Sequence, residues 1–232
     1  MNNSKEFQYT GTDNLEVMDE AVNYTAFLAG LVNQHCSGAE CIVDFGAGIG
    51  TFASQLIKSN RNVIAVEPDE SQCQRMADLG LTCLPEIEMV PDGWADAVYS
   101  INVLEHIEDD TAALKKIYAK LKPEGRLFIF VPAFQVLYSS MDKKVGHFRR
   151  YAKTDLITKV TDSGFYITGT RYADSLGFLA TLIYKWRNDK SGDLNRAALI
   201  TFDRVIFPMS RLLDRLTSAY FGKNLILTAK RK

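Results

Sequence analysis

Short apolar runs alternate along this chain with stretches whose apolar residues recur at helical spacing. The apolar runs predict strands at 41–45, 62–66, 81–84, 95–101, 125–131 and 165–172, and the other stretches predict helices at 18–34, 50–59, 69–79, 111–120 and 153–163. Such alternation is typical of a parallel β-sheet with helices on both faces. Pro85 ends the third run early, so that strand is expected to be short.

The alternation then stops. A long connection at 133–151 carries many charged residues, and connections of this length are often functional. A mostly helical excursion at 175–221 and a last strand at 224–230 follow. Within the excursion, apolar residues at helical spacing predict a helix over 194–216, with arginines on its other faces and a kink at Pro208. The excursion is interpreted as a lid over the sheet, with a dimer interface and a membrane-docking face as alternatives.

The segment 41–50 predicts a strand that breaks into a tight turn, because an apolar run reaches Asp44 and glycines follow at alternate positions. Glycine lets the backbone approach a ligand closely. The next predicted strand ends at Glu67, about 20 residues after the first glycines, where an acid can bind both hydroxyls of an adenosine ribose. Together these features predict a nucleoside cofactor site. Because Thr51 occupies the place of the third glycine of the dinucleotide pattern, the spacing favours a ligand without phosphates.

Composition narrows the class of protein. A chain of 232 residues suits one α/β domain, 1–232, and a net charge of −1 gives no bulk positive field for binding nucleic acid. The four cysteines form no C-x-x-C pair, so reduced thiols in a cytoplasmic protein are expected rather than disulfides or zinc. The polar N-terminus is unlike a signal peptide, and no apolar run reaches the ~20 residues of a membrane span.

Four motifs in this order resemble a class I S-adenosylmethionine-dependent methyltransferase: Asp44-x-Gly-x-Gly-x-Gly50, Glu67, Asn102-Val-Leu-Glu-His-Ile107 and Leu121-Lys-Pro-Glu-Gly-Arg-Leu127. The resemblance covers about residues 20–170 and is to the group that includes ubiquinone-biosynthesis O-methyltransferases and methyltransferases of glycan and secondary metabolism. It implies S-adenosylmethionine as cofactor and a Rossmann-like, seven-stranded, mostly parallel sheet. That sheet would have helices on both faces, an antiparallel C-terminal strand inserted beside its neighbour, and a helical lid at about 175–221.

The resemblance also implies which residues contact the cofactor. Around the methionine part it places Asp44 near the ammonium, the backbone of Gly46, Ala47 and Gly48 against the chain, the carbonyl of Asn102 on the ammonium, and Tyr24 over the carboxylate. Around the adenosine it places Glu67 on the ribose, Pro68 near the adenine, and Glu86 and Ile87 on the adenine amino group and ring face. For Tyr24 the alternative is an ordinary core position on an amphipathic helix.

Methyl transfer to oxygen also requires removal of a proton, and histidine is the natural base at neutral pH. Of the three histidines, His35 is expected to be solvated at a helix end. His106 follows Glu105 near the predicted pocket, and its two interpretations are a base or acceptor contact and a structural hydrogen bond. Some ubiquinone-pathway relatives hold a divalent metal there with a Glu-x-x-Glu-His cluster. Asn102 replaces the first glutamate here, so no metal is expected.

The connection after the fifth predicted strand contains Gly146-His-Phe-Arg-Arg-Tyr151, preceded by Asp142. His147 is the second candidate base. Arginine forks suit a carboxylate or phosphate, so Asp142, Arg149, Arg150 and Tyr151 are predicted to contact the acceptor. In the alternative, Asp142 pairs with an arginine to fix the loop and cap the helix at 153–163.

Taken together, these features predict O-methylation of a small molecule, a sugar or a lipid-linked glycan by a monomer or homodimer. No transmembrane segment is expected, and peripheral membrane contact is an alternative rather than the leading interpretation. A nicotinamide-dependent oxidoreductase is less favoured because the third glycine of its fingerprint is missing. A nucleic-acid methyltransferase is less favoured because Asn102-Val-Leu-Glu replaces the expected Asn/Asp-Pro-Pro-aromatic motif. A cofactor-binding subunit without catalysis is the remaining alternative.

Overall fold

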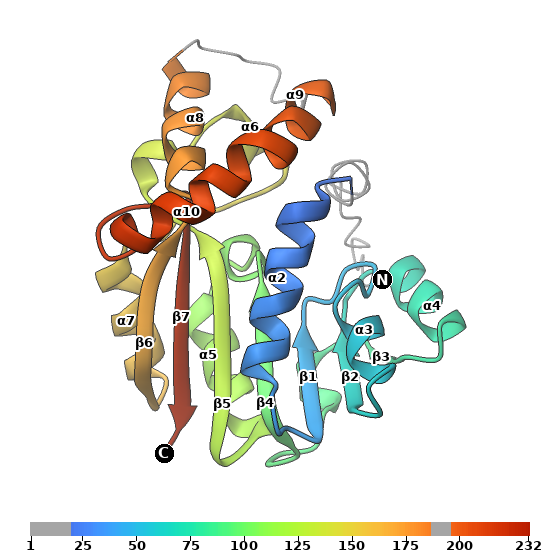
Figure 1. Ribbon diagram of the computed structural model, residues 1–232. Helices are drawn as coiled ribbons and strands as arrows, with labels where there is room; N and C mark the ends of the chain where they lie inside the picture. Colours follow the sequence, from blue (N-terminus) through green and yellow to red (C-terminus); the bar gives the residue numbers. More distant parts are fainter. Residues whose placement is uncertain (1–19, 187–195) are drawn as a thin grey trace, which may run out of the picture.

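The computed structural model describes residues 20–186 and 196–232, and its centre is one seven-stranded sheet (Figure 1). The strand order is β3-β2-β1-β4-β5-β7-β6. The strands are β1 (Cys41–Phe45), β2 (Asn62–Val66), β3 (Thr82–Leu84), β4 (Ala95–Ile101), β5 (Leu121–Pro132), β6 (Phe165–Ala173) and β7 (Asn224–Arg231). All six apolar runs and the last predicted strand are therefore strands.

The first five strands pair in parallel, whereas β7 lies between β5 and β6 and is antiparallel to both. Phe128 of β5 pairs with Thr228 of β7, and Thr170 of β6 pairs with Leu227. This confirms the mostly parallel sheet and the inserted antiparallel strand. Because the parallel strands all end at the same edge, the loops that follow β1, β2, β4 and β5 gather there.

Helices cover both faces of the sheet, as predicted (Figure 1). One hydrophobic cluster joins α2 (Val22–His35), α3 (Ala53–Ile57) and α4 (Glu70–Asp78) to one face. The other joins α5 (Asp110–Lys120) and α7 (Lys153–Asp162) to the opposite face. Neighbouring strand residues such as Ile42 and Val43 belong to opposite clusters, because side chains alternate along a strand. Residues 18 and 19 of the first predicted helix lie outside the described part.

The described parts of the excursion between β6 and β7 are mainly helical, with α8 (Ser175–Trp186), α9 (Arg196–Thr201) and α10 (Phe207–Thr217). A π-helical turn, η4 (Phe202–Ile206), joins α9 to α10, and Pro208 falls in the first turn of α10. The irregularity therefore lies just before Pro208, because proline has no N–H to bond a carbonyl of the preceding helical turn, which is here the π turn. Residues 194 and 195 of the helix predicted there lie outside the described residues.

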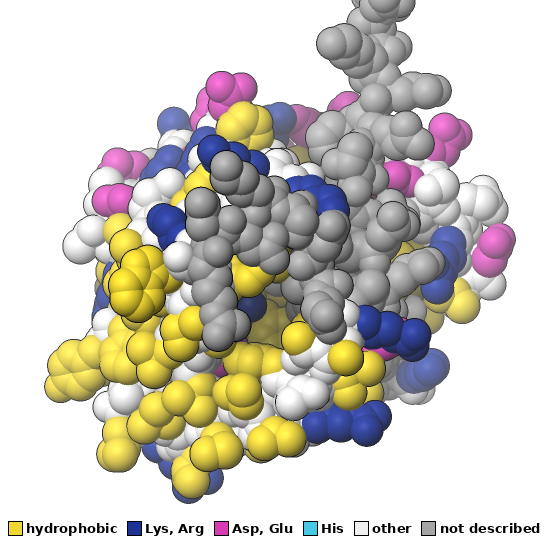
Figure 2. Space-filling view, turned by 90° about the horizontal axis from the view of Figure 1, so that it is seen from above, with side chains coloured by type: hydrophobic (Ala, Val, Ile, Leu, Met, Phe, Trp, Pro, Cys, Tyr) yellow, Lys and Arg dark blue, Asp and Glu magenta, His cyan; other side chains and the backbone are white. Residues whose placement is uncertain are grey.

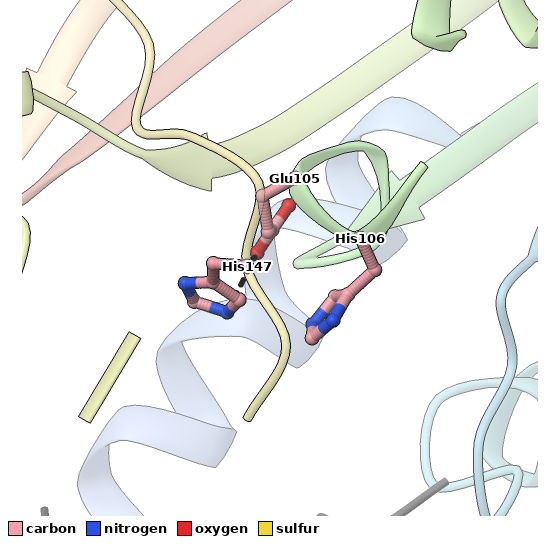
Figure 3. A group of neighbouring side chains, drawn as sticks. All are labelled: Glu105, His106 and His147. Carbon is pink, nitrogen blue, oxygen red and sulfur yellow. Dashed lines mark ion pairs between the residues drawn. The ribbon is translucent and has the colours of Figure 1, made fainter. Parts of the chain in front are cut away.

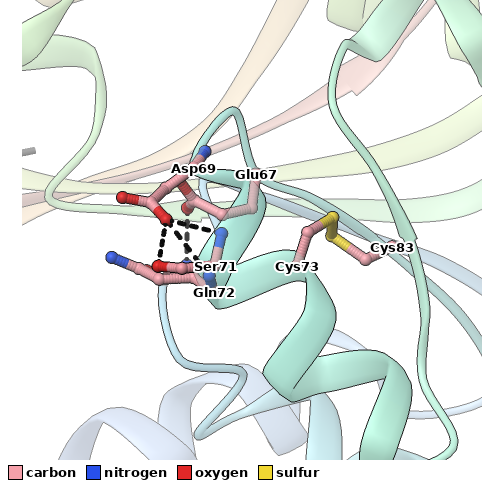
Figure 4. Close-up of a disulfide and its surroundings, with 7 residues drawn as sticks. Glu67, Asp69, Ser71, Gln72, Cys73 and Cys83 are labelled. Atoms are coloured by element: carbon pink, nitrogen blue, oxygen red, sulfur yellow. Dashed lines mark hydrogen bonds between the residues drawn. A yellow bond between two sulfur atoms is a disulfide. The ribbon is translucent and has the colours of Figure 1, made fainter. Parts of the chain in front are cut away.

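Two expectations about single residues are wrong. The imidazole of His35 is not solvated: it packs against Phe128 with ring centroids 5.5 Å apart, and burial lowers its pKa from 6.5 to about 4. Cys73 and Cys83 form a disulfide between α4 and β3, while Cys36 and Cys41 are free (Figure 4). The pairing arises because α4 packs back against β3, which brings the two Cα atoms to 5.4 Å. The argument for a cytoplasmic location that rested on reduced thiols therefore no longer holds.

Among the described residues, the structure contains no helix with the length and apolar character needed to cross a membrane.

Candidate functional site

The glycine turn after β1 has the conformation that its sequence predicts. Gly46, Gly48 and Gly50 all have positive φ, at 80°, 54° and 78°. A Cβ on Gly46 would lie 2.2 Å from Cγ2 of Val103, so no side chain fits between this turn and the loop after β4. A Cβ on Gly50 would lie 2.8 Å from the side chain of Met76. Gly50 therefore serves the packing of the turn against α4, and Gly46 serves its close packing against Val103 in the loop that follows Asn102.

Glu67 is held at the end of β2 by backbone groups from two loops. Its carboxylate accepts hydrogen bonds from the amide of Gly48 at 2.8 Å and from the amide of Asp69 at 3.1 Å. Asp69 in turn caps α4 by accepting from the amides of Ser71 and Gln72 at 3.0 and 3.1 Å (Figure 4). Burial raises the pKa of Glu67, although the hydrogen bonds from these two backbone amides act to lower it. A carboxylate has about four lone-pair sites, so Glu67 can still accept hydrogen bonds from ribose hydroxyls.

Asp44 is buried at the end of β1 and accepts a hydrogen bond of 2.7 Å from the hydroxyl of Tyr99, on the adjacent β4. Burial raises its pKa from 3.8 to about 7, although the Tyr99 bond opposes this shift and the charge of Glu67 adds to it. A carboxyl group in this state becomes anionic when a cation is placed beside it, since an opposite charge lowers a carboxyl pKa.

The residues expected around the adenine lie after β2 and β3. Pro68 and Glu86 are exposed, and Ile87, the first residue of the 3₁₀ turn η1 (Ile87–Met89), is buried. The Ile87 side chain belongs to the core cluster that also contains Phe45 and Val66. Glu86 is therefore accessible from solvent, whereas Ile87 contributes to the core under the loop.

Asn102 and Tyr24 come together from distant parts of the chain. Asn102 follows β4 with a left-handed φ of 53°, and its amide donates to the carbonyl of Phe130 at 2.8 Å. Tyr24 on α2 stacks edge-on against Phe130 and Phe207, with ring centroids 6.3 and 5.3 Å away. Burial raises the pKa of the Tyr24 phenol, while hydrogen bonding with the side chains of Asn102 and Asn224 opposes the shift. Tyr24 thus packs in the core and also reaches the end of β4.

Asp142 is buried in the connection after β5 and bonds to several residues of that connection. It belongs to the short helix α6 (Ser140–Lys144), where it forms a capping box with Ser139. Its carboxylate accepts from Nε and an Nη of Arg150 at 2.8 and 3.1 Å, and it lies 2.8 Å from Nδ1 of His147. Burial would raise its pKa, but the bonds with His147 and Arg150 outweigh burial and hold the pKa well below the usual range. The ion pair between Asp142 and Arg150 fixes the loop, as one alternative predicted. The helix that Asp142 caps is α6 rather than α7, because the N-cap residue of α7, Ala152, makes no side-chain hydrogen bond.

Glu105, His106 and His147 meet at the end of β4 (Figure 3). Glu105 and His106 lie in the 3₁₀ turn η2 (Leu104–His106), and His147 comes from the connection after β5. The two imidazole centroids are 4.6 Å apart, and Nε2 of His147 lies 3.9 Å from Oε1 of Glu105. One ligand-capable atom from each residue falls within 4.8 Å of the others, a spacing that can hold a metal ion.

The electrostatics of this cluster are set by burial. Glu105 is 0% exposed, and neither carboxylate oxygen has a hydrogen-bond partner among the described residues. Burial raises its pKa from 4.5 to about 8, so it holds a proton at neutral pH. Burial, together with the neighbouring His147, lowers the pKa of His106 from 6.5 to about 4, which keeps that ring neutral. The cluster therefore offers a carboxylic acid and a neutral imidazole beside His147.

Arg149 and Tyr151, expected to contact the acceptor, both bond to Asp110 at the start of α5. The Tyr151 hydroxyl donates to Asp110 at 2.8 Å, and an Nη of Arg149 lies 2.8 Å from the same carboxylate. Tyr151 is buried in the core. Arg150 is also buried, with Asp142 as its partner. The structure thus gives these three residues internal partners that anchor the loop to α5 and α6.

Sequence reasoning did not include two residues that organise the site, Glu105 and Asp110. Glu105 stood out only as part of an incomplete metal pattern, because its partner His147 lies far along the chain. Asp110 looks like an ordinary acid in the first turn of a helix. Only the folded connection brings Tyr151 and Lys159 to it, at 2.8 and 2.5 Å.

The residues at this sheet edge fit a nucleoside cofactor with an amino-acid end. The turn at Gly46 excludes a side chain, and Asp44 and Glu67 end adjacent parallel strands. Asn102 ends the strand on the other side of β1. These three strand ends place carboxylates and backbone groups at one edge of the sheet.

Comparison with known proteins points the same way. The family described as a methyltransferase domain matches residues 15–168. A ubiquinone biosynthesis O-methyltransferase of Bradyrhizobium diazoefficiens is 29% identical over 103 residues, which cover 41% of this chain and 41% of the relative. An uncharacterized methyltransferase of Mycobacterium tuberculosis is 30% identical over 115 residues, covering 47% and 57%. The chain thus spans about half the length of the curated relatives it matches.

Solved structures share the fold at low sequence identity. A SAM-dependent methyltransferase from Archaeoglobus fulgidus superposes with a TM-score of 0.61 at 16% identity, over 89% of this chain and 94% of that one. A 1,6-didemethyltoxoflavin-N1-methyltransferase of Burkholderia thailandensis, with bound S-adenosylhomocysteine, gives 0.59 at 16%, over 95% and 83%. The family match, the sheet order and the glycine turn agree: this chain belongs to the methyltransferase-domain family, within the class I enzymes that use S-adenosylmethionine as cofactor.

Proposed function

We propose that this protein transfers a methyl group from S-adenosylmethionine to an oxygen atom of a small molecule, a sugar or a lipid-linked glycan. The observation that carries the oxygen assignment is the Asp142–His147 pair, with 2.8 Å between the carboxylate and Nδ1. An oxygen acceptor must lose its proton, whereas the lone pair of a free amine needs no base. A carboxylate fixed on Nδ1 orients the ring and leaves Nε2 to take a proton.

The cofactor would be held at the ends of β1, β2 and β4. Its sulfonium supplies an already activated methyl group, so the protein contributes chiefly orientation and exclusion of water. Glu67, fixed by the amides of Gly48 and Asp69, would accept the ribose hydroxyls. Asp44 and the backbone of the glycine turn around Gly46 and Gly48 would receive the methionine end, with the carbonyl of Asn102 opposite. Glu86 would remain on the adenine side, where its exposure keeps it accessible.

His147 would act as the base, with His106 beside it on the acceptor side and the buried Glu105 packed next to both rings. The turn η2 begins two residues after Asn102, so the cluster adjoins the strand end that faces the cofactor. The neutral ring of His106 can accept a hydrogen bond from the acceptor. Arg149, Arg150 and Tyr151 would act by positioning the loop that carries His147, since their polar groups bond to Asp110 and Asp142.

The acceptor atom can be tested before the acceptor molecule itself is identified. The full chain is incubated with a small-molecule and lipid extract and with S-adenosylmethionine carrying an isotope-labelled methyl group. The NMR chemical shift of the transferred methyl carbon then distinguishes attachment to oxygen, nitrogen or sulfur. We expect an oxygen-bound methyl group. A nitrogen- or sulfur-bound methyl would contradict the oxygen assignment while keeping methyl transfer, and S-adenosylhomocysteine binding without any transfer would favour a non-catalytic subunit.

A further inference from the structure

The helices α8 and α10 pack side by side at the end of the sheet where the parallel strands end (Figure 1). Each has a row of exposed apolar side chains at helical spacing. We define these rows as the apolar face: Leu179, Leu182, Ile183 and Trp186 on α8, and Val205, Met209, Leu212, Leu216 and Tyr220 along η4, α10 and the turn after it. Trp186 is 91% exposed and Leu216 is 78% exposed. Seen from above, hydrophobic side chains gather over one side of this end of the molecule (Figure 2).

The exposed apolar side chains of α10 do not belong to the side of the helix that packs on the rest of the protein. The buried side of α10 is separate and well bonded: Phe207 packs against Tyr24, and Ser210 donates to the carboxylate of Asp174 at 2.8 Å. The carboxylate of Asp214 accepts from the amides of Asp174 and Ser175 at 2.9 and 3.0 Å. The face is therefore presented by a rigid pair of helices. Contiguous exposed apolar side chains of this kind mark an interaction surface.

The exposed charged side chains of these helices are all basic, although one of them, Arg196, is paired with Glu20 at 2.6 Å. Within 175–186 and 196–221 the only acidic residues are Asp203 and Asp214, and both are buried. The basic residues of the same ranges reach the surface: Lys185, Arg196, Arg204, Arg211 and Arg215. Figure 2 shows Lys and Arg side chains at the margins of the hydrophobic area. An apolar helix face with a basic margin is the arrangement that binds the surface of an anionic bilayer.

A pocket of about 450 Å³ adjoins this face, between α10 and β6. Three arginines line it, Arg171, Arg211 and Arg215, together with Leu212 of the apolar face. Its one acid, Asp214, already accepts from the α8 N-terminus and lies 3.5 Å from Arg211. Among the described residues, the Arg171 side chain has no hydrogen bond or ion pair in the structure. Guanidinium groups bind phosphate oxygens through paired hydrogen bonds, so this pocket suits a phosphate group.

We propose that the apolar face docks on a membrane surface rich in anionic lipids, and that the arginine pocket takes the phosphate of a lipid headgroup. The apolar rows would enter the boundary between headgroups and acyl chains, where Trp186 and Tyr220 also suit an interfacial position. The charge pattern argues against a second copy of this chain as the occupant, because a two-fold interface would bring the basic margins of both copies together. This docking is independent of the acceptor atom and of the catalytic cluster.

The test is flotation of the full chain with vesicles of phosphatidylcholine alone and of equimolar phosphatidylcholine and phosphatidylglycerol. We expect binding to the anionic vesicles, weakened by salt, and little binding to the neutral ones. Leu212→Asp and Leu216→Asp should each reduce vesicle affinity by about tenfold or more, since each replaces a membrane-buried apolar group by a charge. Arg171→Gln should reduce the preference for anionic vesicles. Leu79→Asp is the matched control, because Leu79 is equally apolar and 55% exposed at the end of α4.

Three outcomes would overturn the proposal. One is no binding of the wild-type chain to anionic vesicles. Another is equal loss of binding in Leu79→Asp and Leu212→Asp. The third is a wild-type dimer that Leu216→Asp dissociates while vesicles bind neither form, which would make the apolar face an interface between copies. Circular dichroism establishes whether each variant is folded. Arg171 is partly exposed on β6, so Arg171→Gln tests the proposal without changing the packing of α8 against α10.

Discussion

His147 is the residue on which proton removal depends in the proposed reaction. Its Nδ1 is fixed by Asp142, and its Nε2 faces Glu105 at 3.9 Å. Replacement by alanine should lower kcat by roughly 10²–10⁴-fold, the usual contribution of a general base, and leave the affinity for S-adenosylhomocysteine unchanged. The rate of labelled methyl transfer into the extract measures the first effect, and calorimetry measures the second.

Lys143→Ala is the control for this change, because Lys143 is exposed on α6, close to His147 in the same loop. It should leave both quantities unchanged. If His147→Ala instead lowered the melting temperature and all activities in proportion, the imidazole would serve only to hold the loop. An unchanged kcat would indicate an acceptor that needs no base.

Glu105 should make stability fall as pH rises. Its folded pKa of about 8 exceeds the ordinary 4.5, so the folded chain keeps a proton that the unfolded chain releases. The stabilisation is complete below about pH 4.5 and is lost as pH rises through about 8. Glutamine cannot titrate. The melting temperature of Glu105→Gln relative to wild type should therefore rise from pH 5 to pH 9, about the window of this shift. A difference that stayed constant with pH would show that Glu105 is ionised throughout.

Single residues divide into those that local pattern predicts and those that it does not. The location of Asp44, Glu67 and Asn102 at one edge of the sheet was predictable, because the carboxyl ends of parallel strands meet there; their contacts with the cofactor remain a prediction. The meeting of Glu105 with His147 was not, because it depends on how a long connection folds. Its course is set by buried ion pairs that no short-range pattern reveals.

At the scale of elements, the strands were predicted closely because runs buried on both faces are apolar throughout. The details that escaped prediction depend on contacts between elements. The π turn η4 replaces a simple kink at Pro208, and the Cys73–Cys83 disulfide follows from the packing of α4 on β3. Neither spacing in sequence nor composition specifies those contacts. The insertion of β7 between β5 and β6 was anticipated from the resemblance alone.

The start of α8 offers an element-scale prediction with a matched control. A Cβ on Gly177 would lie 1.9 Å from a carboxylate oxygen of Asp174, which the hydroxyl of Ser210 holds in place. Gly177→Ala should therefore destabilise the fold by about 1–3 kcal/mol, the usual cost of overpacking. A Cβ on Gly30, in α2, would meet no atom within 4 Å, so Gly30→Ala should be neutral or stabilise by about 0.5–1 kcal/mol. Chemical denaturation measures both changes, and equal effects would contradict the contact at Asp174.

At the scale of the whole molecule, one edge of the sheet carries the proposed cofactor site, the cluster of Glu105, His106 and His147, and the helices of the apolar face (Figure 1). Methyl transfer there should survive dialysis against EDTA. Asn102 replaces the first glutamate of the Glu-x-x-Glu-His pattern that holds a divalent metal, so one carboxylate ligand of that pattern is missing from the cluster. Activity that EDTA abolishes and magnesium or zinc restores would instead make Glu105, His106 and His147 metal ligands, for which their 4.8 Å spacing is suitable.

The most direct test of the proposed cofactor site is calorimetric titration with S-adenosylhomocysteine of the wild-type chain, Glu67→Ala and Glu70→Ala. Glu70 is the matched control, since it is exposed in the first turn of α4, next to the loop that holds Glu67. Loss of a charged hydrogen bond worth about 1.5–3 kcal/mol should weaken binding by at least about tenfold in Glu67→Ala and leave Glu70→Ala unchanged. Unchanged affinity in a folded Glu67→Ala variant, or tighter binding of NADH than of S-adenosylhomocysteine by the wild type, would contradict the site at the ends of β1 and β2.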